Sequence, residues 1–168
     1  MRLDIEARKH AESLFQSKLI NAVIPARDRK LAKAKFSFGR HRGGLSQEYA
    51  IALLEARLQY AEDVAKAQVW AIFQAHQKSR VLFDEDAFRA ALAQVRSTLD
   101  WNGRAAYRET LGDLDRSGCL LEKRTKRTLE KRADTGLKRI FGDVFDALLA
   151  KRDALILASK TSKAASVA

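Results

Sequence analysis

The chain has few of the residues that cross-link or interrupt a fold. Its 168 residues include one cysteine, one proline and eight glycines. Cys119 alone cannot form an intrachain disulfide, and no cysteine and histidine spacing matches a zinc site. Collagen-like and linker-like chains are excluded by the low proline and glycine content, and 46% hydrophobic residues are too many for wholesale disorder. We expect a folded domain with no metal and no cofactor.

Long apolar runs are also absent. The longest stretch without a charged residue is Ala67–Gln77, far short of the ~20 apolar residues that a membrane-spanning helix needs. Asp4 and Glu6 lie where a secretory signal would carry its apolar region, and these acids also argue against a transit peptide. The sequence therefore predicts a cytoplasmic protein with no membrane span.

Positive charge is abundant and unevenly distributed. The net charge is +11. Residues 1–44 carry 11 Lys and Arg against 4 Asp and Glu, residues 45–100 carry 6 against 8, and residues 101–168 carry 15 against 9. Two basic regions thus flank a mildly acidic middle, and a polyanion could bind either one.

Apolar residues recur at helical spacings throughout, and no segment shows the two-residue alternation of a strand. We predict an all-α fold, an irregular helical bundle, with a single domain over residues 1–158. Within it, residues 1–44 form a basic helical arm and a glycine-rich loop, and residues 45–158 form the helical core. Residues 159–168 lack large apolar groups apart from Val167 and are expected to form a flexible tail.

The first half of the chain predicts three helices. One covers residues 3–23 and is expected to break or kink at Ile24, because a proline disfavours helical geometry in the residue before it. A short helix follows over residues 26–35. Three glycines in residues 37–44 predict a loop. A long central helix then runs from about 46 to 80, with an apolar surface broad enough to pack on two sides.

The second half contains stronger helix signals. Asp84 is a candidate N-cap, and the Asn102-Gly103 pair predicts a turn near Trp101. Gly112 and the Ser117-Gly118 pair predict that the segment up to Cys119 is irregular or at best weakly helical. Residues 137–158 carry the strongest amphipathic pattern of the chain, and spacing alone leaves open whether Gly136 breaks this helix.

The first candidate binding site is the basic tract at residues 27–42, where Phe36 and Phe38 stand among the cations. Basic side chains can neutralise phosphates, and aromatic rings can stack on unpaired bases. The alternative is that the phenylalanines anchor the loop to the core and the cations are only solvated. The cations of this candidate site are Arg27, Arg29, Lys30, Lys33, Lys35, Arg40 and Arg42.

The tract also contains a partial phosphate-loop spacing. Gly39 and Gly44 are spaced as that motif requires, but Leu45 replaces its lysine, which argues against a nucleotide triphosphatase. An isolated phosphate could still dock beside Arg40 and Arg42, although a tight connection is the simpler explanation of the glycines.

The second candidate site is the basic stretch at residues 123–132. If helical, it forms a cationic ridge that could follow a phosphate backbone, and nothing in it selects particular bases. A basic helix of this kind could instead meet acidic lipid or an acidic protein. The cations are Lys123, Arg124, Lys126, Arg127, Lys131 and Arg132.

No catalytic motif is present, and the acids at Asp84 and after it are better explained as helix-start residues. Trp70 and Trp101 are expected to be buried. These patterns predict a non-enzymatic helical protein that binds nucleic acid, DNA or RNA, through phosphate contacts with low sequence specificity. The alternative is a structural or adaptor protein whose helices self-associate, in a coiled-coil-like manner, or dock an acidic partner.

Overall fold

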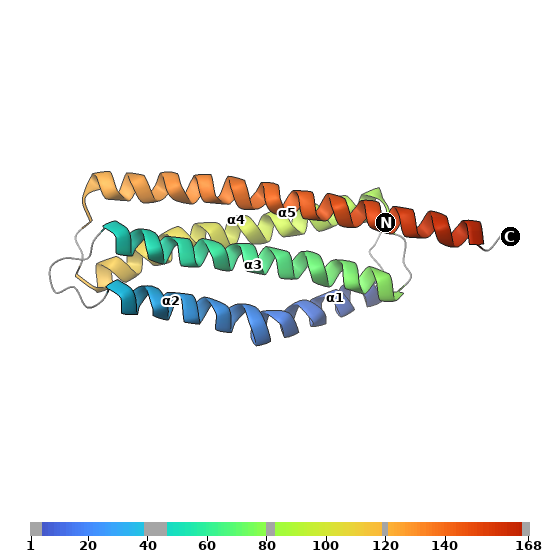
Figure 1. The fold of residues 1–168 in the computed structure, drawn as a ribbon, viewed down its shortest axis with the longest axis horizontal. Coiled ribbons are helices and arrows are strands. Elements are labelled where there is room, and N and C mark those ends of the chain that lie inside the picture. The colour runs from blue at the N-terminus through green and yellow to red at the C-terminus, as the bar shows by residue number, and fades with distance from the viewer. Residues whose placement is uncertain (1–4, 39–46, 80–82, 119–120, 166–168) are drawn as a thin grey trace.

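The computed structural model describes residues 5–38, 47–79, 83–118 and 121–165. Over these residues the chain is an all-α bundle, as predicted (Figure 1). Its elements are α1 (Ile5–Lys18), a π-helical turn (Leu19–Val23), α2 (Ile24–Phe38), α3 (Gln47–Ser79), α4 (Glu85–Arg116) and α5 (Lys123–Ala165).

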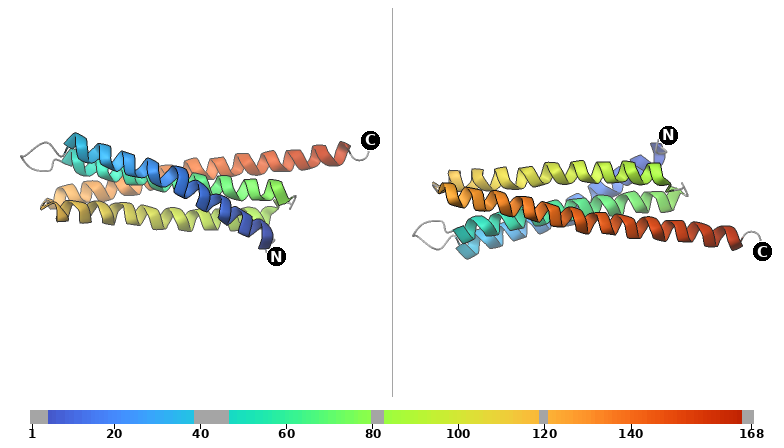
Figure 2. Two further views of the ribbon diagram at one scale, coloured as in Figure 1. Left: turned by 90° about the horizontal axis from the view of Figure 1, so that it is seen from below. Right: turned by 90° about the horizontal axis from the view of Figure 1, so that it is seen from above.

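The helices form three layers, with successive long helices antiparallel (Figures 1 and 2). The pair α3 and α4 lies in the middle, α1 and α2 cover one side, and α5 crosses the other. Short connections favour this arrangement, because they place consecutive helices side by side. The end of α2, the start of α3, the end of α4 and the start of α5 therefore meet at one end of the bundle.

The predicted long central helix is present as α3, and it packs on more than one side. Leu53 and Leu54 are consecutive residues and both are fully buried, which is possible only when neighbours cover two faces of the helix. Its contacts are with α1, the π-helical turn, α2, α4 and α5.

Of the break or kink predicted at Ile24, the break is not observed, but the helix bends near this point (Figures 1 and 2). Ile24 has helical dihedral angles, φ −63° and ψ −49°, and the helix passes through Pro25 into α2. A proline ring clashes with the carbonyl group four residues earlier in an α-helix. The π-helical turn at Leu19–Val23 widens the helix just before the proline, so the chain continues without a break.

Helix α4 begins as predicted, but the prediction of a turn at Asn102-Gly103 is wrong. The Asp84 side chain accepts a hydrogen bond from the Ala87 amide at 2.9 Å and caps the helix. The helix then runs through Asn102, whose side chain donates to the Thr98 carbonyl at 2.8 Å. It passes Gly112 and ends at Arg116, before a turn in which Gly118 has φ 75°. Most of the segment predicted to be irregular or weakly helical is therefore regular helix.

Gly103 is explained by packing instead of by a turn. A Cβ atom at this position would lie under 3.0 Å from three atoms of the Leu137 side chain on α5. The missing side chain allows α4 and α5 to approach closely at this point.

We expect Gly103→Ala to destabilise the protein by about 1 to 2 kcal/mol, because overpacking costs about 1 to 3 kcal/mol and outweighs the improvement in helix propensity. Gly142→Ala is the matched control. A Cβ atom at the exposed Gly142 would meet nothing within 4 Å, so this variant should be stabilised by up to about 1 kcal/mol. Urea unfolding measures both, and equal effects would contradict the packing role of Gly103.

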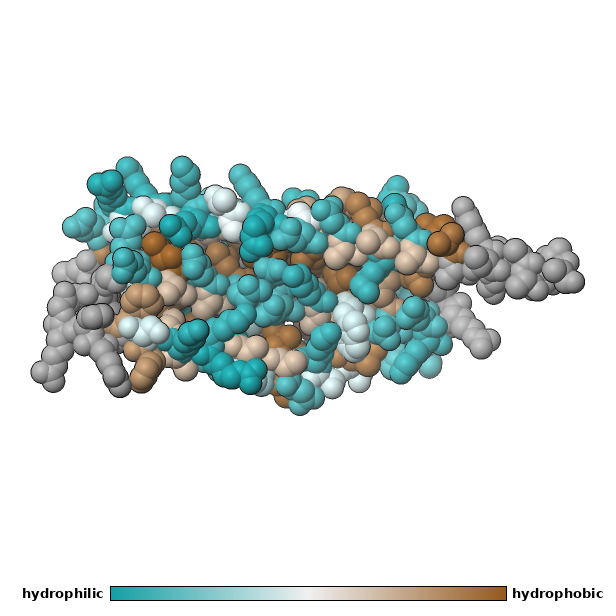
Figure 3. Space-filling model, viewed as in Figure 1, coloured by the Kyte–Doolittle hydropathy of each residue, from teal (hydrophilic) through white to brown (hydrophobic). Residues whose placement is uncertain are grey.

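Helix α5 is continuous, so Gly136 does not break it. A Cβ atom at Gly136 would lie 2.9 Å from Leu58 Cδ1, which places this glycine at the contact with α3. The helix extends beyond the ends of α3 and α4 (Figure 1) and continues to Ala165, past the predicted start of the tail at residue 159. Hydrophobic side chains gather on its C-terminal part, at the right of Figure 3, where Ile156 and Leu157 are exposed.

Candidate nucleic-acid interface

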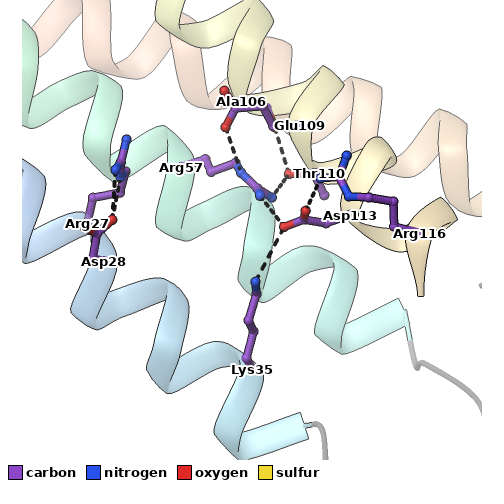
Figure 4. A network of polar contacts seen from close by, with 9 residues as sticks. All are labelled: Arg27, Asp28, Lys35, Arg57, Ala106, Glu109, Thr110, Asp113 and Arg116. Carbon is purple, nitrogen blue, oxygen red and sulfur yellow. Dashed lines mark hydrogen bonds and ion pairs between the residues drawn. The ribbon is translucent and has the colours of Figure 1, made fainter.

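Three cations of the first basic tract lie beside carboxylates of the bundle or of their own helix. Arg27 pairs with Asp28 at 2.9 Å and stacks over the Tyr60 ring at 5.0 Å. Two lysines of α2 reach other helices. Lys30 lies 3.8 Å from Asp63 on α3, and Lys35 lies 4.0 Å from Asp113 on α4. The two lysines help to hold α2 on the central pair, as Figure 4 shows for Lys35, and the charge of all three cations is partly neutralised within the protein.

The outer side of α2 is different. Arg29 and Lys33 are exposed and form no ion pair with the described residues. Phe36 is on the same helical face, three residues after Lys33, and is 67% exposed. Phe38 instead packs against the Tyr49 ring, with 6.1 Å between the ring centroids. Phe38 therefore packs against the core, which is the anchoring role considered above, whereas Phe36 is exposed, as stacking on a base would require.

Asp113 is the centre of a polar cluster that joins α2, α3 and α4 (Figure 4). Buried Arg57 on α3 donates to the Asp113 carboxylate at 2.5 Å and to the Thr110 hydroxyl at 3.0 Å, and its Nε lies 3.3 Å from Glu109. Arg116 pairs with the same carboxylate from the solvent side. Through Lys35, this cluster connects the C-terminal part of α2 to the core.

Two carboxylates are held in their charged form. Burial alone would raise the pKa of Asp113, but hydrogen bonds from Arg57 and Arg116 and the charge of Lys35 outweigh it and keep the pKa below its ordinary value. Glu62 on α3 is buried, whereas Asp113 is partly exposed. The bonds of Glu62 to Lys66 and Arg139, at 2.5 Å and 3.3 Å, likewise hold its pKa below the ordinary value despite burial.

Because both pKa values are lowered by folding, the unfolded chain takes up protons first as the pH falls. The stability that these carboxylates contribute is complete at neutral pH and should be lost as the pH falls below their ordinary values of 4.5 and 3.8. Thermal unfolding between neutral pH and pH ~3 measures this loss. In a Glu62→Gln, Asp113→Asn double variant the melting temperature should depend less on pH, and an unchanged dependence would contradict the assignment.

The second basic tract forms the first turns of α5. Arg132 lies 3.3 Å from Glu55 on α3. The other five cations are exposed and form no ion pair with the described residues. We call this set the α5 ridge. Its members are Lys123, Arg124, Lys126, Arg127 and Lys131.

The two tracts lie at the same end of the bundle but in opposite outer layers (Figures 1 and 2). Helices α3 and α4 separate them, and no Cα atom of α2 lies within 8 Å of one in α5. A flat footprint that covers both tracts is therefore not available, and a ligand that touched both would wrap around the end of the bundle. Arg40 and Arg42 lie between α2 and α3 in the chain, outside the described residues.

Trp101 is a surface residue that the sequence interpretation placed in the core. It is 69% exposed on α4, and the Arg108 guanidinium lies 5.9 Å from its ring. Trp70 is half-buried, with the Lys18 ammonium 4.1 Å from its ring. Periodicity could have identified Trp101, because Arg104 and Arg108 follow it at three- and four-residue steps on one helical face.

Among the described residues, no group of three or more His, Cys, Asp or Glu could hold a metal ion. No helix in the same part of the chain combines the length and the apolar character that crossing a bilayer requires. Comparisons of the sequence and the structure with models of protein families, with curated proteins and with solved structures found no match.

Proposed function

We propose that this protein binds nucleic acid through phosphate contacts made by the α5 ridge. The observation that carries the proposal is that the five cations of the ridge project from one end of the bundle without a carboxylate partner among the described residues. Clustered Lys and Arg side chains bind phosphates and release the counterions that surround a polyanion.

The position of the ridge in its helix supports a role in binding. A helix N-terminus carries a partial positive charge and favours acids in its first turn. The first turns of α3 and α4 contain Glu48 and Glu85, whereas the first turn of α5 has no acid. Cations crowded at this position oppose helix formation, and an anionic ligand would relieve their repulsion.

We infer low sequence specificity, and no enzymatic activity. Long, exposed Lys and Arg side chains at closely spaced positions suit contacts with the phosphate backbone of a nucleic acid. Recognition of particular bases usually needs side chains that are held in a groove of the nucleic acid. Arg29, Lys33 and Phe36 on α2 would give a second contact to a strand that bends around the bundle end. A cytoplasmic location stays a prediction.

Fluorescence anisotropy with labelled single-stranded and duplex oligonucleotides tests the proposal. If all five ridge cations contact phosphates, the logarithm of the affinity should fall with the logarithm of salt concentration with a slope of about −3.5 for single strands and about −4.5 for duplex DNA. Absence of binding at low salt would contradict the proposal, and a slope near zero would exclude phosphate contacts as its basis.

A second candidate function is that of an adaptor that self-associates or docks an acidic protein. The observation that favours it is the C-terminal part of α5, which extends beyond the bundle and exposes Ile156 and Leu157. Exposed apolar side chains on a helix suit a helical partner. Light scattering over a range of protein concentrations tests it: a mass that rises with concentration, without oligonucleotide binding, would favour this function over the first.

A further inference from the structure

A cavity of about 160 Å³ lies between α1, α3 and α4, at the end of the bundle opposite the α5 ridge. Alanines from all three helices, together with Phe15 and Ile72, make up about half of its lining, and the other lining residues are polar or charged. Ala71 and Ala91 are buried lining residues, and Phe15 of α1 also lines the cavity. The cavity exists because the alanine side chains at these positions are too small to fill the space between the three helices.

Gln68 gives this cavity a polar group. Its side chain lines the cavity, the residue is only 6% exposed, and its Oε1 atom has no hydrogen-bond partner among the described residues. Buried carbonyl oxygens are nearly always hydrogen-bonded, because leaving one unsatisfied is costly. A molecule in the cavity that donates a hydrogen bond would satisfy Gln68.

The mouth of the cavity indicates the charge of such a molecule. The exposed side chains at the rim are Arg8 and Glu12 of α1, together with Gln16 and Gln94. The rim thus has one cation and one anion. The buried polar residues of the lining are Gln68 and His76, and none of the buried lining residues is Asp, Glu, Lys or Arg. An uncharged ligand fits this balance best.

We propose that the cavity binds a small, neutral molecule with an apolar body and one hydrogen-bond donor, of the size and kind of a monocyclic aromatic alcohol. A cavity of about 150 Å³ accommodates benzene, whereas drug-sized ligands need about 300 to 1,000 Å³. The ring would lie among the alanines beside Phe15, and the hydroxyl group would donate to Gln68 Oε1. This site is separate from the α5 ridge and does not depend on nucleic-acid binding.

Isothermal titration calorimetry with phenol and with toluene tests the proposal. The two probes have the same shape, but only phenol can donate to Gln68 Oε1. Phenol should bind saturably and at least about tenfold more tightly than toluene, the effect of one hydrogen bond. Equal affinities would overturn the role of Gln68, and no binding of either probe would overturn the site and leave water as its occupant.

Variants separate this site from others on the protein. Gln68→Leu should remove the preference for phenol, with Gln68→Met as a substitute if the leucine variant does not fold. Ala91→Leu fills the cavity and should abolish binding, whereas Ala90→Leu, the same change at the exposed neighbouring position, should leave it intact. Circular dichroism checks that each variant is folded. Undiminished phenol binding by folded Ala91→Leu would place the probe elsewhere and overturn the proposal.

Discussion

Arg57→Met is expected to destabilise the protein by about 3 kcal/mol, equivalent to a fall of about 6 to 12 °C in melting temperature. The Arg57 side chain is 7% exposed and bonds to Thr110 and Asp113. Methionine keeps much of its volume but removes the charge that faces Asp113. The loss lies at the lower end of the range for a broken buried ion pair, because Arg116 and Lys35 still reach Asp113.

Arg116→Met is the matched control, since Arg116 contacts the same carboxylate but is 74% exposed. Exposed ion pairs contribute less than about 1 kcal/mol, so this variant should lose little stability. Arg57→Met combined with Asp113→Leu should recover most of the loss, because a buried pair replaced by apolar residues is often neutral. If the two arginine variants lose equal stability in urea, burial does not determine the strength of these contacts.

The helices of this chain could be predicted from its sequence because each of them buries an apolar face of helical period. The structural roles of the glycines and the proline could not be predicted, because these roles depend on the residues that surround them in the folded protein. Gly103 fits a turn when only Asn102 is considered, but in the bundle it allows the approach of Leu137, 34 positions later. Pro25 indicates a break unless the preceding turn can widen, and the residues of the π-helical turn, Leu19–Val23, do not differ in type from those of an ordinary helix.

The candidate sites show the same limit. Residue type and spacing located both basic tracts, but not which cations are neutralised, because the carboxylates are far away in the chain. Lys35 pairs with Asp113 and Arg132 pairs with Glu55, each 77 or 78 positions apart. The cavity at Gln68 depends on three helices at once and has no local signal. Only the folded bundle shows which cations form the α5 ridge and which cations pair with carboxylates of other helices.

Neutralising the α5 ridge should reduce oligonucleotide affinity on the order of 100- to 1,000-fold at about 0.15 M salt, because each cation that no longer binds a phosphate removes about 0.7 to 0.9 from the salt slope. Four glutamine substitutions on the N-terminal turns suffice, and the slope should become shallower by about 3 to 4. The substituted residues are Lys123, Arg124, Lys126 and Arg127.

A control variant has the same net charge but leaves the ridge intact. Its four glutamines replace exposed lysines on α1, α3 and α5, away from the first turns of α5. These lysines are Lys9, Lys78, Lys138 and Lys151. The control should lose less than about tenfold in affinity, since only long-range attraction falls. Equal losses in the two variants would mean that net charge, and not the ridge, determines binding.

Stability measurements separate binding from folding in the same ridge variant. Glutamine removes cations that repel one another at the positive end of α5, so the variant should be as stable as the wild type or more stable, by up to about 1 kcal/mol. Replacing residues that stabilise a helix lowers the stability of the protein. Residues that serve to bind a ligand are instead expected to lower the stability of the unliganded protein, so replacing them should not destabilise it. A ridge variant that loses both affinity and stability would show that these cations support the fold of α5, and binding would then need another explanation.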